Sequence, residues 1–505
     1  MIQPPLMRDD HDEHVRSRRS LLVMAVSAAA GLALTACGAA AGTPATTASS
    51  APSAAAQTSA AASASVSTAV TSSASASSAA ASTASSATSS ASAAPAKAAN
   101  TVRFLERAGQ NYQDYFKAAI IEFQKANPDL IVQSEWTNKY TDKLVAETAG
   151  GTPPDLAFTS DDDLFSLAAK GLLLDIAKYF QRDKLNKDDY FPIAIDAQFL
   201  KGKQWAMPLD LGVWVFFVNK DLFQKAGVAM PDSTWDFSKL QQAAQQLTID
   251  AAGKTAPGLD PATVVQAGFD AGSLRYGIDI PVGGYGGSVF SADITKCLLG
   301  DQAALDGLQW TADLSTKALA ALGPGITTKQ KINFDSGNLA LKIGGSWSIG
   351  AERQAKLGFT WDIAPPPKGP NKDMIIAEAS GISQINGSKN PDGAWLFNKY
   401  MTGPGGQTLA FQYTVASVPS VKSVAATVYQ TASQPASMPI LADLANKSSI
   451  PYWQRAVSDT ELEDLFSKEL TPLWQGKQSA RDVMANVVPN VEVILGRDQQ
   501  FLAKL

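Results

Sequence analysis

A nearly continuous apolar run lies in the middle of the chain, from Val213 to Val218. A strand that is apolar on both alternating faces is typical of one buried on both sides of a sheet. Asp210 precedes the run, Trp214 lies within it, and Asn219-Lys220-Asp221 follows it, where we expect a helix to begin. Polar and aromatic groups at the mouth of a buried strand are typical of a ligand site in an α/β protein.

The hydrophobic pattern before this run alternates between the two periods of regular structure. It predicts strands at Thr101–Leu105, Leu130–Trp136 and Leu156–Thr159, and helices at Tyr112–Lys125 and Tyr140–Ala149. In the first helix, aromatic and aliphatic residues recur at helical spacing. This rhythm of strand and helix predicts a mostly parallel sheet flanked by helices.

The first hundred residues have a different pattern. Residues 16–37 read RSRRSLLVMAVSAAAGLALTAC, a basic start followed by a short, alanine-rich apolar stretch. This pattern favours a signal peptide over residues 1–36 and not a transmembrane helix. Residues 34–38 resemble the bacterial lipobox, which implies that Cys37 is acylated and becomes the new N-terminus. The paired arginines Arg18 and Arg19 also resemble a twin-arginine export motif, and the export route stays open.

Residues 38–99 consist almost wholly of Ala, Ser and Thr. Such a segment cannot bury apolar surface against itself, so we expect residues 37–100 to form a disordered tether behind the lipidated cysteine. A flexible coil of this length has a root-mean-square reach on the order of 45 Å. The folded part of the chain would therefore begin near Thr101 and remain close to a membrane.

Composition excludes several kinds of chemistry. The chain has two histidines, His11 and His14, and both lie in the predicted leader. The mature chain would lack Ser-His-Asp and Cys-His catalysis and most transition-metal sites, so we expect no metal and no cofactor. Cys297 would have no disulfide partner and is expected to be a small buried residue. The net charge of −5 without a basic tract argues against nucleic acid as a partner.

Six segments in the same order carry a resemblance to a known family: EFQKANPDL, GGTPPDLAF, LAAKGLLLDI, PLDLGVWVFFVNKDLFQKAGV, FDSGNLALKIGGSW and WDIAPPP. From Thr101 to about Leu505 the chain resembles extracellular solute-binding proteins of the maltose-binding type, the capture subunits of ABC importers for sugars. The resemblance implies the two-lobed periplasmic-binding-protein fold of type II. Each lobe would be a mostly parallel sheet with helices, and the chain would cross between lobes.

The resemblance also implies where the lobes begin and end. Lobe 1 would comprise 101–210 and 366–403, and lobe 2 would comprise 211–365 and 404–505. Turn-forming residues at Pro365-Pro366-Pro367 and Gly403-Pro404-Gly405-Gly406 interrupt periodic segments at two of these boundaries.

Sugar sites combine flat aromatic rings with carboxylates and amides. The resemblance implies that Trp347 stacks on the sugar, that Trp453 is a second aromatic contact, and that Asp161 and Asp162 bind hydroxyl groups. Helix N-capping is the alternative for these carboxylates. The family's best-known member has an aromatic residue before the acidic position where this chain has Thr159-Ser160, which leaves the sugar's identity open.

Further candidate contacts are less constrained. Asp210 and Trp214 would lie on the hinge side of the cleft, at the first crossing between lobes. Tyr285 lies in a glycine-rich segment that either approaches a ligand or forms a simple turn. Gln110 and Trp136 lie at predicted strand ends of the first lobe. The tryptophans expected in the core are Trp235, Trp310, Trp361, Trp395 and Trp474.

Together these features predict a monomeric, non-enzymatic lipoprotein on the outer face of the cell membrane. It would capture a mono- or oligosaccharide by hinge closure and deliver it to ABC permease subunits. One alternative is a secreted glycoside hydrolase that pairs Asp210 with a carboxylate among Asp161, Asp162 and Asp163. Another is a surface sugar sensor without a transporter.

Overall fold

The structure, a computed structural model, describes residues 100–106, 109–271, 274–413, 417–430 and 435–505. The predicted signal peptide, the lipidation site Cys37 and residues 38–99 of the predicted tether lie outside these ranges. None of the helices in these ranges is long and apolar enough to cross a bilayer.

The first strands and helices follow the hydrophobic pattern closely. Strand β1 (Asn100–Glu106) pairs in parallel with β2 (Leu130–Trp136) and with β3 (Leu156–Thr159). Helices α2 (Gln110–Ala126) and α3 (Tyr140–Ala149) provide the crossover connections that parallel strands require. The predicted order of strands and helices is confirmed, with bounds that differ by two residues or fewer.

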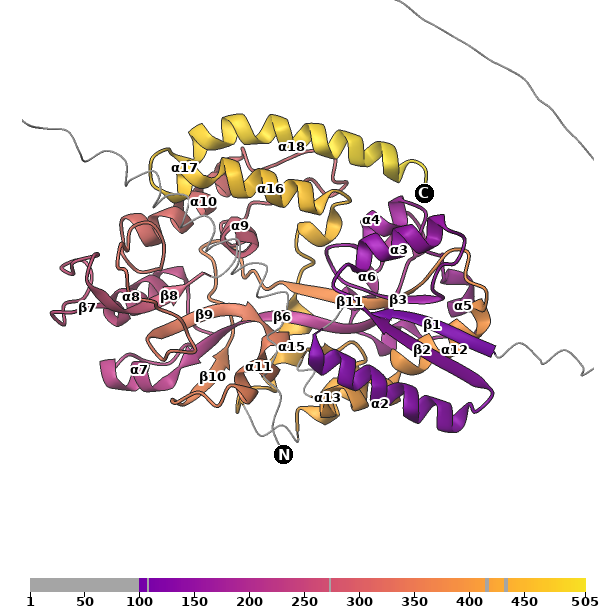
Figure 1. Cartoon of the computed structure of the whole chain (residues 1–505). Helices are drawn as coiled ribbons and strands as arrows, with labels where there is room; N and C mark the ends of the chain where they lie inside the picture. The colour runs from indigo at the N-terminus through magenta and orange to yellow at the C-terminus, as the bar shows by residue number, and fades with distance from the viewer. Residues whose placement is uncertain (1–99, 107–108, 272–273, 414–416, 431–434) are drawn as a thin grey trace, which may run out of the picture. The chain divides into compact units, whose positions relative to one another are not determined.

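The apolar run belongs to the central strand of the sheet, β6 (Met207–Asn219), in which every residue is buried. Its first half pairs antiparallel with β11 (Ala377–Gln384), and its second half pairs antiparallel with β9 (Leu339–Gly345). The sheet order is β2-β1-β3-β11-β6-β9-β8-β7, so β6 runs between the N-terminal strands and those from the middle of the chain (Figure 1).

A helix begins at the position that the sequence predicts. The side chain of Asn219 accepts a hydrogen bond from the backbone N–H of Leu222 and caps α7 (Lys220–Ala226). Gly227, in the left-handed conformation at φ 65°, ends the helix. The predicted buried strand followed by a helix is therefore confirmed, and the strand is longer than the run because Met207 to Leu211 also pair with neighbouring strands.

The remaining elements are the helices and the other strands, of which β7, β8, β10 and β12 belong to this sheet and β4 and β5 form a second one. In chain order they are α4 (Leu164–Ala169), α5 (Ala177–Arg182), η1 (Lys187–Asp189), α6 (Pro192–Asp196), β4 (Phe199–Leu200), β5 (Lys203–Gln204), α8 (Phe237–Leu247), β7 (Ile249–Asp250), β8 (Val264–Asp270), α9 (Leu274–Gly284), α10 (Gln302–Thr316), η2 (Ser346–Ser348), α11 (Ile349–Gln354), β10 (Trp361–Ala364), α12 (Pro391–Met401), α13 (Pro404–Gln412), β12 (Val418–Pro419), α14 (Lys422–Val428), α15 (Ile440–Lys447), η3 (Trp453–Arg455), α16 (Asp459–Glu469), α17 (Thr471–Trp474) and α18 (Ala480–Leu502).

Alternate side chains of β6 enter two different hydrophobic cores, as expected for a strand buried on both faces. Phe216 and Val218 pack in a core with α8, α10 and α18, whereas Val215 and Phe217 pack in a core with α6 and α15. Cys297 is buried in the first of these cores, as predicted.

The tryptophans expected in the core divide into two groups. Trp235 and Trp395 are buried, as predicted. Trp310, Trp361 and Trp474 are only partly buried, because each packs against a core from its edge.

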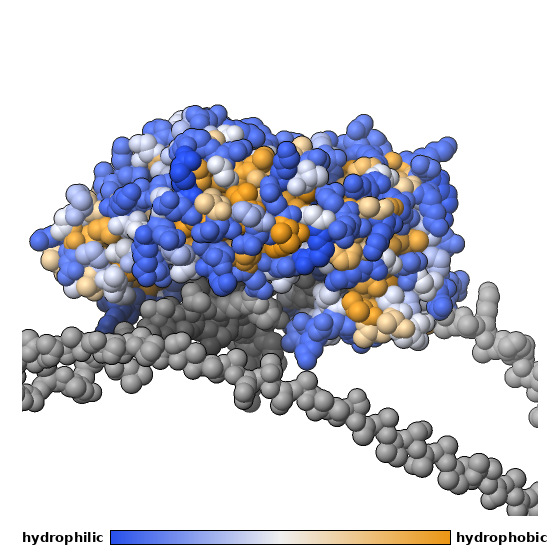
Figure 2. All heavy atoms as spheres, turned by 90° about the horizontal axis from the view of Figure 1, so that it is seen from above, coloured by the Kyte–Doolittle hydropathy of each residue, from blue (hydrophilic) through white to orange (hydrophobic). Residues whose placement is uncertain are grey.

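Helix α18 lies across the outside of the C-terminal part of the chain. Val487 and Val491 pack in one core, while Leu502 packs with Leu105 of β1 in another. Val493 points outward and is 72% exposed. Figure 2, which shows the side of the chain on which α18 lies, has hydrophobic residues in groups among hydrophilic ones. This helix therefore packs against both the C-terminal elements and the N-terminal strand β1.

Candidate ligand-binding site

The site is built on one face of three neighbouring strands. In β6, Gly212 pairs with Glu378 of β11, and Trp214 pairs with Gly345 of β9. Paired residues in antiparallel strands point to the same face of a sheet, and so do residues two apart along a strand. These four residues therefore share one face, on which the glycines leave open space.

The ring of Trp347 fills that space. Trp347 lies in η2, directly after β9, and remains partly exposed. A Cβ atom at Gly212 would lie 2.4 Å from this ring, and one at Gly345 would lie 1.9 Å from it. Real Cβ contacts of that length do not occur, so a glycine at each position is required for the indole to lie against the strands.

Two further tryptophans join Trp347. The ring of Trp214 contacts that of Trp347 edge to face, with centroids 5.2 Å apart, and it lies 6.4 Å from that of Trp453. Trp453, in η3, is fully buried. Edge-to-face contacts between aromatic rings are favourable and fix the relative orientation of the rings. We call Trp214, Trp347 and Trp453 the tryptophan group.

Each buried indole N–H of this group has a carboxylate acceptor. Trp214 donates to Glu378 Oε1 over 2.7 Å. Trp453 donates to Asp161 Oδ2 over 2.8 Å. Asp161 follows the C-terminal end of β3, whereas Trp453 lies almost three hundred positions later, so this hydrogen bond joins the N-terminal part of the sheet to the C-terminal part of the chain.

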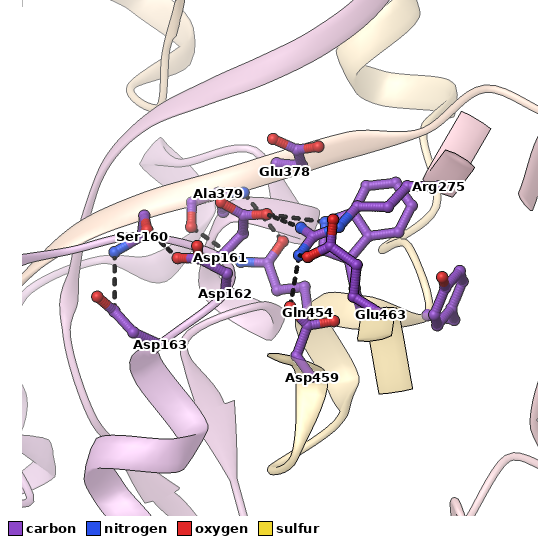
Figure 3. A network of polar contacts seen from close by, with 12 residues as sticks. Ser160, Asp161, Asp162, Asp163, Arg275, Glu378, Ala379, Gln454, Asp459 and Glu463 are labelled. Atoms are coloured by element: carbon purple, nitrogen blue, oxygen red, sulfur yellow. Dashed lines mark hydrogen bonds and ion pairs between the residues drawn. The ribbon is translucent and has the colours of Figure 1, made fainter. Parts of the chain in front are cut away.

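Arg275, from α9, holds the carboxylates of this region together (Figure 3). Its guanidinium lies 2.6 Å from Asp459 and 3.1 Å from Glu463, both on α16, and 3.7 Å from Asp161. It also lies over the ring of Trp453, 5.2 Å from the centroid, a favourable position for a cation. These contacts fix Asp161 from a second side.

Burial changes the protonation of the acidic groups. It raises the pKa of Glu378 well above its usual range, and the charge of Asp161 raises it further, against the effects of Arg275 and the Trp214 N–H. Burial also raises the pKa of Asp459 to about 8, although Arg275 opposes this shift. A protonated Glu378 both donates and accepts hydrogen bonds, which suits it to a hydroxyl-bearing ligand.

Asp279 provides a test of the same effect away from the tryptophan group. It is buried on α9, accepts a hydrogen bond from the backbone N–H of Tyr452 over 3.0 Å, and has its pKa raised to about 7 by burial. The folded chain therefore binds this proton more tightly than the unfolded chain does. Stability from this group is present below about pH 4 and is lost as the pH rises through about 7.

We expect Asp279→Asn to flatten this pH dependence, because the amide cannot ionise. Urea unfolding at a series of pH values from about 4 to 8 should show a smaller loss of stability for the variant than for the unmodified chain. Equal losses in the two proteins would contradict the assignment. Asp232→Asn is a suitable control, because the hydroxyl and the N–H of Thr234 lower the pKa of Asp232. Its contribution to stability therefore changes only below about pH 4, and this variant should lose as much stability from pH 4 to 8 as the unmodified chain.

The three neighbouring aspartates have separate roles. Asp161 contacts the tryptophan group through the hydrogen bond from Trp453. Asp162 accepts a hydrogen bond from the Ser160 hydroxyl over 2.5 Å, and Asp163 accepts one from the Ser160 N–H over 3.1 Å. Figure 3 shows Asp163 directed to the backbone of Ser160. The segment therefore stabilises its own turn and presents the carboxylate of Asp161 to the site, and the predicted ligand contact of Asp162 stays a prediction.

Four other residues singled out from the sequence have different surroundings. Asp210 is buried and accepts hydrogen bonds over 2.5 Å each from the hydroxyls of Tyr112 and Ser380. The others are Gln110, exposed and bonded to Asp114; Trp136, 42% exposed at the end of β2; and Tyr285, packed on Phe237. The predicted ligand contacts of these four residues stay predictions.

Sequence reasoning missed the polar partners in this region: Arg275, Glu378, Gln454, Asp459 and Glu463. Gln454, for example, donates to the carbonyl of Ala379 and accepts from its N–H, next to Glu378. Some signals were present in the sequence. Glu378 is the only charged residue of β11. On α16, Asp459 and Glu463 are four residues apart and so share a helix face.

Residues 105–408 match the family of bacterial extracellular solute-binding proteins, and the chain belongs to this family. Its fold is the type II periplasmic-binding-protein fold, and its family places it outside the cytoplasm and among binding proteins, not enzymes. A maltotriose-binding protein of Pyrococcus abyssi is 24% identical over 304 residues, which are 58% of this chain and 60% of that protein.

Solved structures show the same fold. An ABC substrate-binding protein of Listeria monocytogenes in complex with cycloalternan superposes with a TM-score of 0.66, at 21% identity over 78% of this chain and 99% of that one. UgpB of Mycobacterium tuberculosis, in complex with glycerophosphocholine, superposes with a TM-score of 0.65, at 18% identity over 79% of this chain and 98% of that one.

Proposed function

We propose that this chain captures a carbohydrate, a mono- or oligosaccharide, at the tryptophan group and delivers it to an ABC import permease. The observation that carries this proposal is the partly exposed indole of Trp347, held flat against two glycines on the same face of the sheet as Glu378. Relatives that bind maltotriose and cycloalternan support a carbohydrate as the ligand class.

The residues fit the two surfaces that a sugar presents. The apolar C–H face of a pyranose would stack on Trp347, and its hydroxyls would exchange hydrogen bonds with Glu378 and Asp161. Glu378 serves as a donor in its protonated form, while Asp161 accepts. A stacking ring with flanking hydrogen-bonding groups orients the sugar and selects for hydroxyls at defined positions.

We propose hinge closure because the residues of the site come from both of the proposed lobes. We propose lobes of 101–210 with 366–403 and of 211–365 with 404–505, which would place Asp161 in the first lobe and Trp347 in the second. A ligand that contacts both lobes binds the closed arrangement more tightly and shifts the population toward it. The hydrogen bond from Trp453 to Asp161 and the ion pair with Arg275 would support the same closed arrangement.

Titration of the purified chain carrying Cys37→Ser tests the ligand class. Maltotriose, mannobiose, cycloalternan and glycerophosphocholine are each added while tryptophan fluorescence and heat are recorded. At least one sugar should give a saturable change in both signals, because binding covers Trp347. A response to glycerophosphocholine with no response to any sugar would contradict the carbohydrate proposal.

Membrane anchoring through Cys37 is a separate part of the proposal. We expect Cys37→Ser to move the protein from the membrane fraction to the soluble fraction, because the acylated side chain is lost. Cys297→Ser is the matched control and should leave the protein in the membrane fraction, since Cys297 is buried in the folded part. Fractionation followed by immunoblotting measures both. Unchanged membrane association of the Cys37→Ser protein would contradict a lipid anchor.

Delivery to a permease distinguishes a transport component from a surface sensor. Deleting the gene for this chain should abolish uptake of the sugar found by titration, and a copy of the gene should restore it. Normal uptake in the deletion strain would favour the sensor.

The glycines beneath Trp347 give a further expected result. Gly345→Ala should weaken sugar binding by about tenfold or more, because the new Cβ would lie 1.9 Å from the indole and displace it. Gly358→Ala is the matched control, since a Cβ there meets no atom within 4 Å. Calorimetric titration of both variants measures the change. Equal affinities would contradict the proposal that Gly345 is needed to hold the Trp347 indole in place.

A further inference from the structure

A hollow lies between α8 and α10, and none of the residues that line it belongs to the tryptophan group. Its volume is about 610 Å³, enough for a sugar of one or two rings. Trp310 and Tyr285 provide its aromatic surface, and Gln241, Gln245 and Asp306 are among its polar residues. The hollow is open to solvent on one side.

The aromatic surface of this hollow is supported from below. The ring of Phe237 stacks on one face of Trp310, with centroids 4.2 Å apart and planes 14° apart, and it also contacts Tyr285. Trp310 lines the hollow and is partly exposed, so the face of the indole opposite Phe237 is the one available to a ligand. This is the geometry of a platform for stacking.

The glycine-rich segment that contains Tyr285 makes this platform possible. A Cβ atom at Gly284 would lie 2.7 Å from the ring of Phe237, and one at Gly287 would lie 2.8 Å from the backbone nitrogen of Ala304 on α10. The glycines therefore allow Phe237 and α10 to approach the end of α9. The sequence left open whether this segment approaches a ligand or forms a simple turn. The structure shows that its glycines also bring aromatic rings together.

Several polar side chains around this hollow are held in place by hydrogen bonds within the protein. Gln245 donates to the carbonyl of Ala318 over 2.9 Å, which leaves its side-chain oxygen as an acceptor. Asp313 accepts from Gln309 over 2.8 Å and from Lys317 over 2.9 Å. Fixed amides and carboxylates beside an aromatic face match a sugar, which presents hydroxyls around an apolar ring face, better than they match a wholly apolar ligand.

We infer that this hollow is a second carbohydrate-binding site, which takes one pyranose ring on Trp310 with hydroxyls bonded to Gln241, Gln245 and Asp306. It is independent of the proposed main site. Affinity should be weak, with a dissociation constant on the order of 1 mM, because an open hollow covers one face of the ring and leaves the other in water.

Fluorine NMR of the chain labelled with 5-fluorotryptophan can observe this site directly. Comparison with Trp310→Phe and Trp347→Phe assigns the two signals that matter. Maltotriose and mannobiose are then added to about 50 mM, well above the expected dissociation constant. We expect the Trp310 signal to shift saturably and to do so with the same midpoint in the Trp347→Ala variant, in which the affinity of the main site should be about 100-fold weaker.

A rim variant on α8 gives a second measurement. Gln241→Ala should raise the midpoint for the Trp310 shift by about tenfold. Gln242→Ala is the matched control on the same helix, because Gln242 is exposed, bonded to Ser238 and outside the hollow. It should leave the midpoint unchanged.

The outcomes separate the two sites. A Trp310 signal that stays in place while the Trp347 signal shifts overturns the second site and leaves the proposed function intact. A Trp310 shift without a Trp347 shift supports the second site and contradicts the main one. A Trp310 shift that disappears in Trp347→Ala, or whose midpoint rises with that of the main site, reports closure of the main site and overturns the inference.

Discussion

Trp347→Ala is expected to weaken carbohydrate binding by about 100-fold or more, which corresponds to roughly 3 kcal/mol. The indole is the one partly exposed ring of the tryptophan group, and its removal would leave open space between the Gly212 and Gly345 backbones where the sugar should stack. Glu378 and Asp161 would then form hydrogen bonds with a sugar that no longer stacks on an aromatic ring. Calorimetric titration with the sugar found to bind the unmodified chain measures the loss.

Two variants define what the loss means. Trp347→Phe keeps a flat ring and should retain part of the affinity. Trp361→Phe replaces another partly buried tryptophan, which stacks on Phe217 with centroids 6.1 Å apart, and should leave affinity unchanged. If Trp347→Ala and Trp361→Phe bound sugar equally well, the tryptophan group would not be the ligand site.

Arg275→Ala should lower the free energy of unfolding by about 3 kcal/mol at about pH 9, where Asp459 is mainly charged, because it removes the cation between several carboxylates. The side chain of Asp459 is 2% exposed and lies 2.6 Å from the guanidinium. Without Arg275, the charged form of Asp459 would be buried with less compensation. Since burial raises the pKa of this group to about 8 already, the loss should shrink as the pH falls and Asp459 binds a proton.

Arg497→Ala is the matched control for Arg275. Arg497 also pairs with a carboxylate on α16, Glu461, but the two side chains are 45% and 52% exposed. Exposed ion pairs contribute little to stability, so this variant should unfold at nearly the same urea concentration as the unmodified chain. Equal effects of the two substitutions would contradict the importance of burial around Arg275.

The elements that depend on local pattern were predictable from the sequence. The period of apolar residues predicted β1, α2, β2, α3 and β3, and the unbroken run from Val213 predicted the buried β6. The resemblance to the family supplied the set Asp161, Trp347 and Trp453, and the strand's own sequence supplied Trp214. The structure brings these four side chains into one connected group.

The polar partners could not be predicted, because they depend on pairing over long sequence distances. Glu378 reaches the site only through the register that places it opposite Gly212. Arg275 meets Asp459 from helices separated by almost two hundred residues. The same limitation applies to Asp210, because its position before the apolar run did not reveal the hydrogen bonds from the hydroxyls of Tyr112 and Ser380; its ligand contact stays a prediction.

The glycine floor under Trp347 has a consequence for protein engineering. Gly212 and Gly345 are on adjacent strands, and any side chain at either position would collide with the indole. Neither glycine can therefore be replaced by a slightly larger residue, since even the methyl group of alanine would displace the Trp347 ring. A biosensor with altered sugar preference should be built by substituting Glu378 and Asp161, which are proposed to bind the sugar hydroxyls. Gly212, Gly345 and Trp347 should be kept.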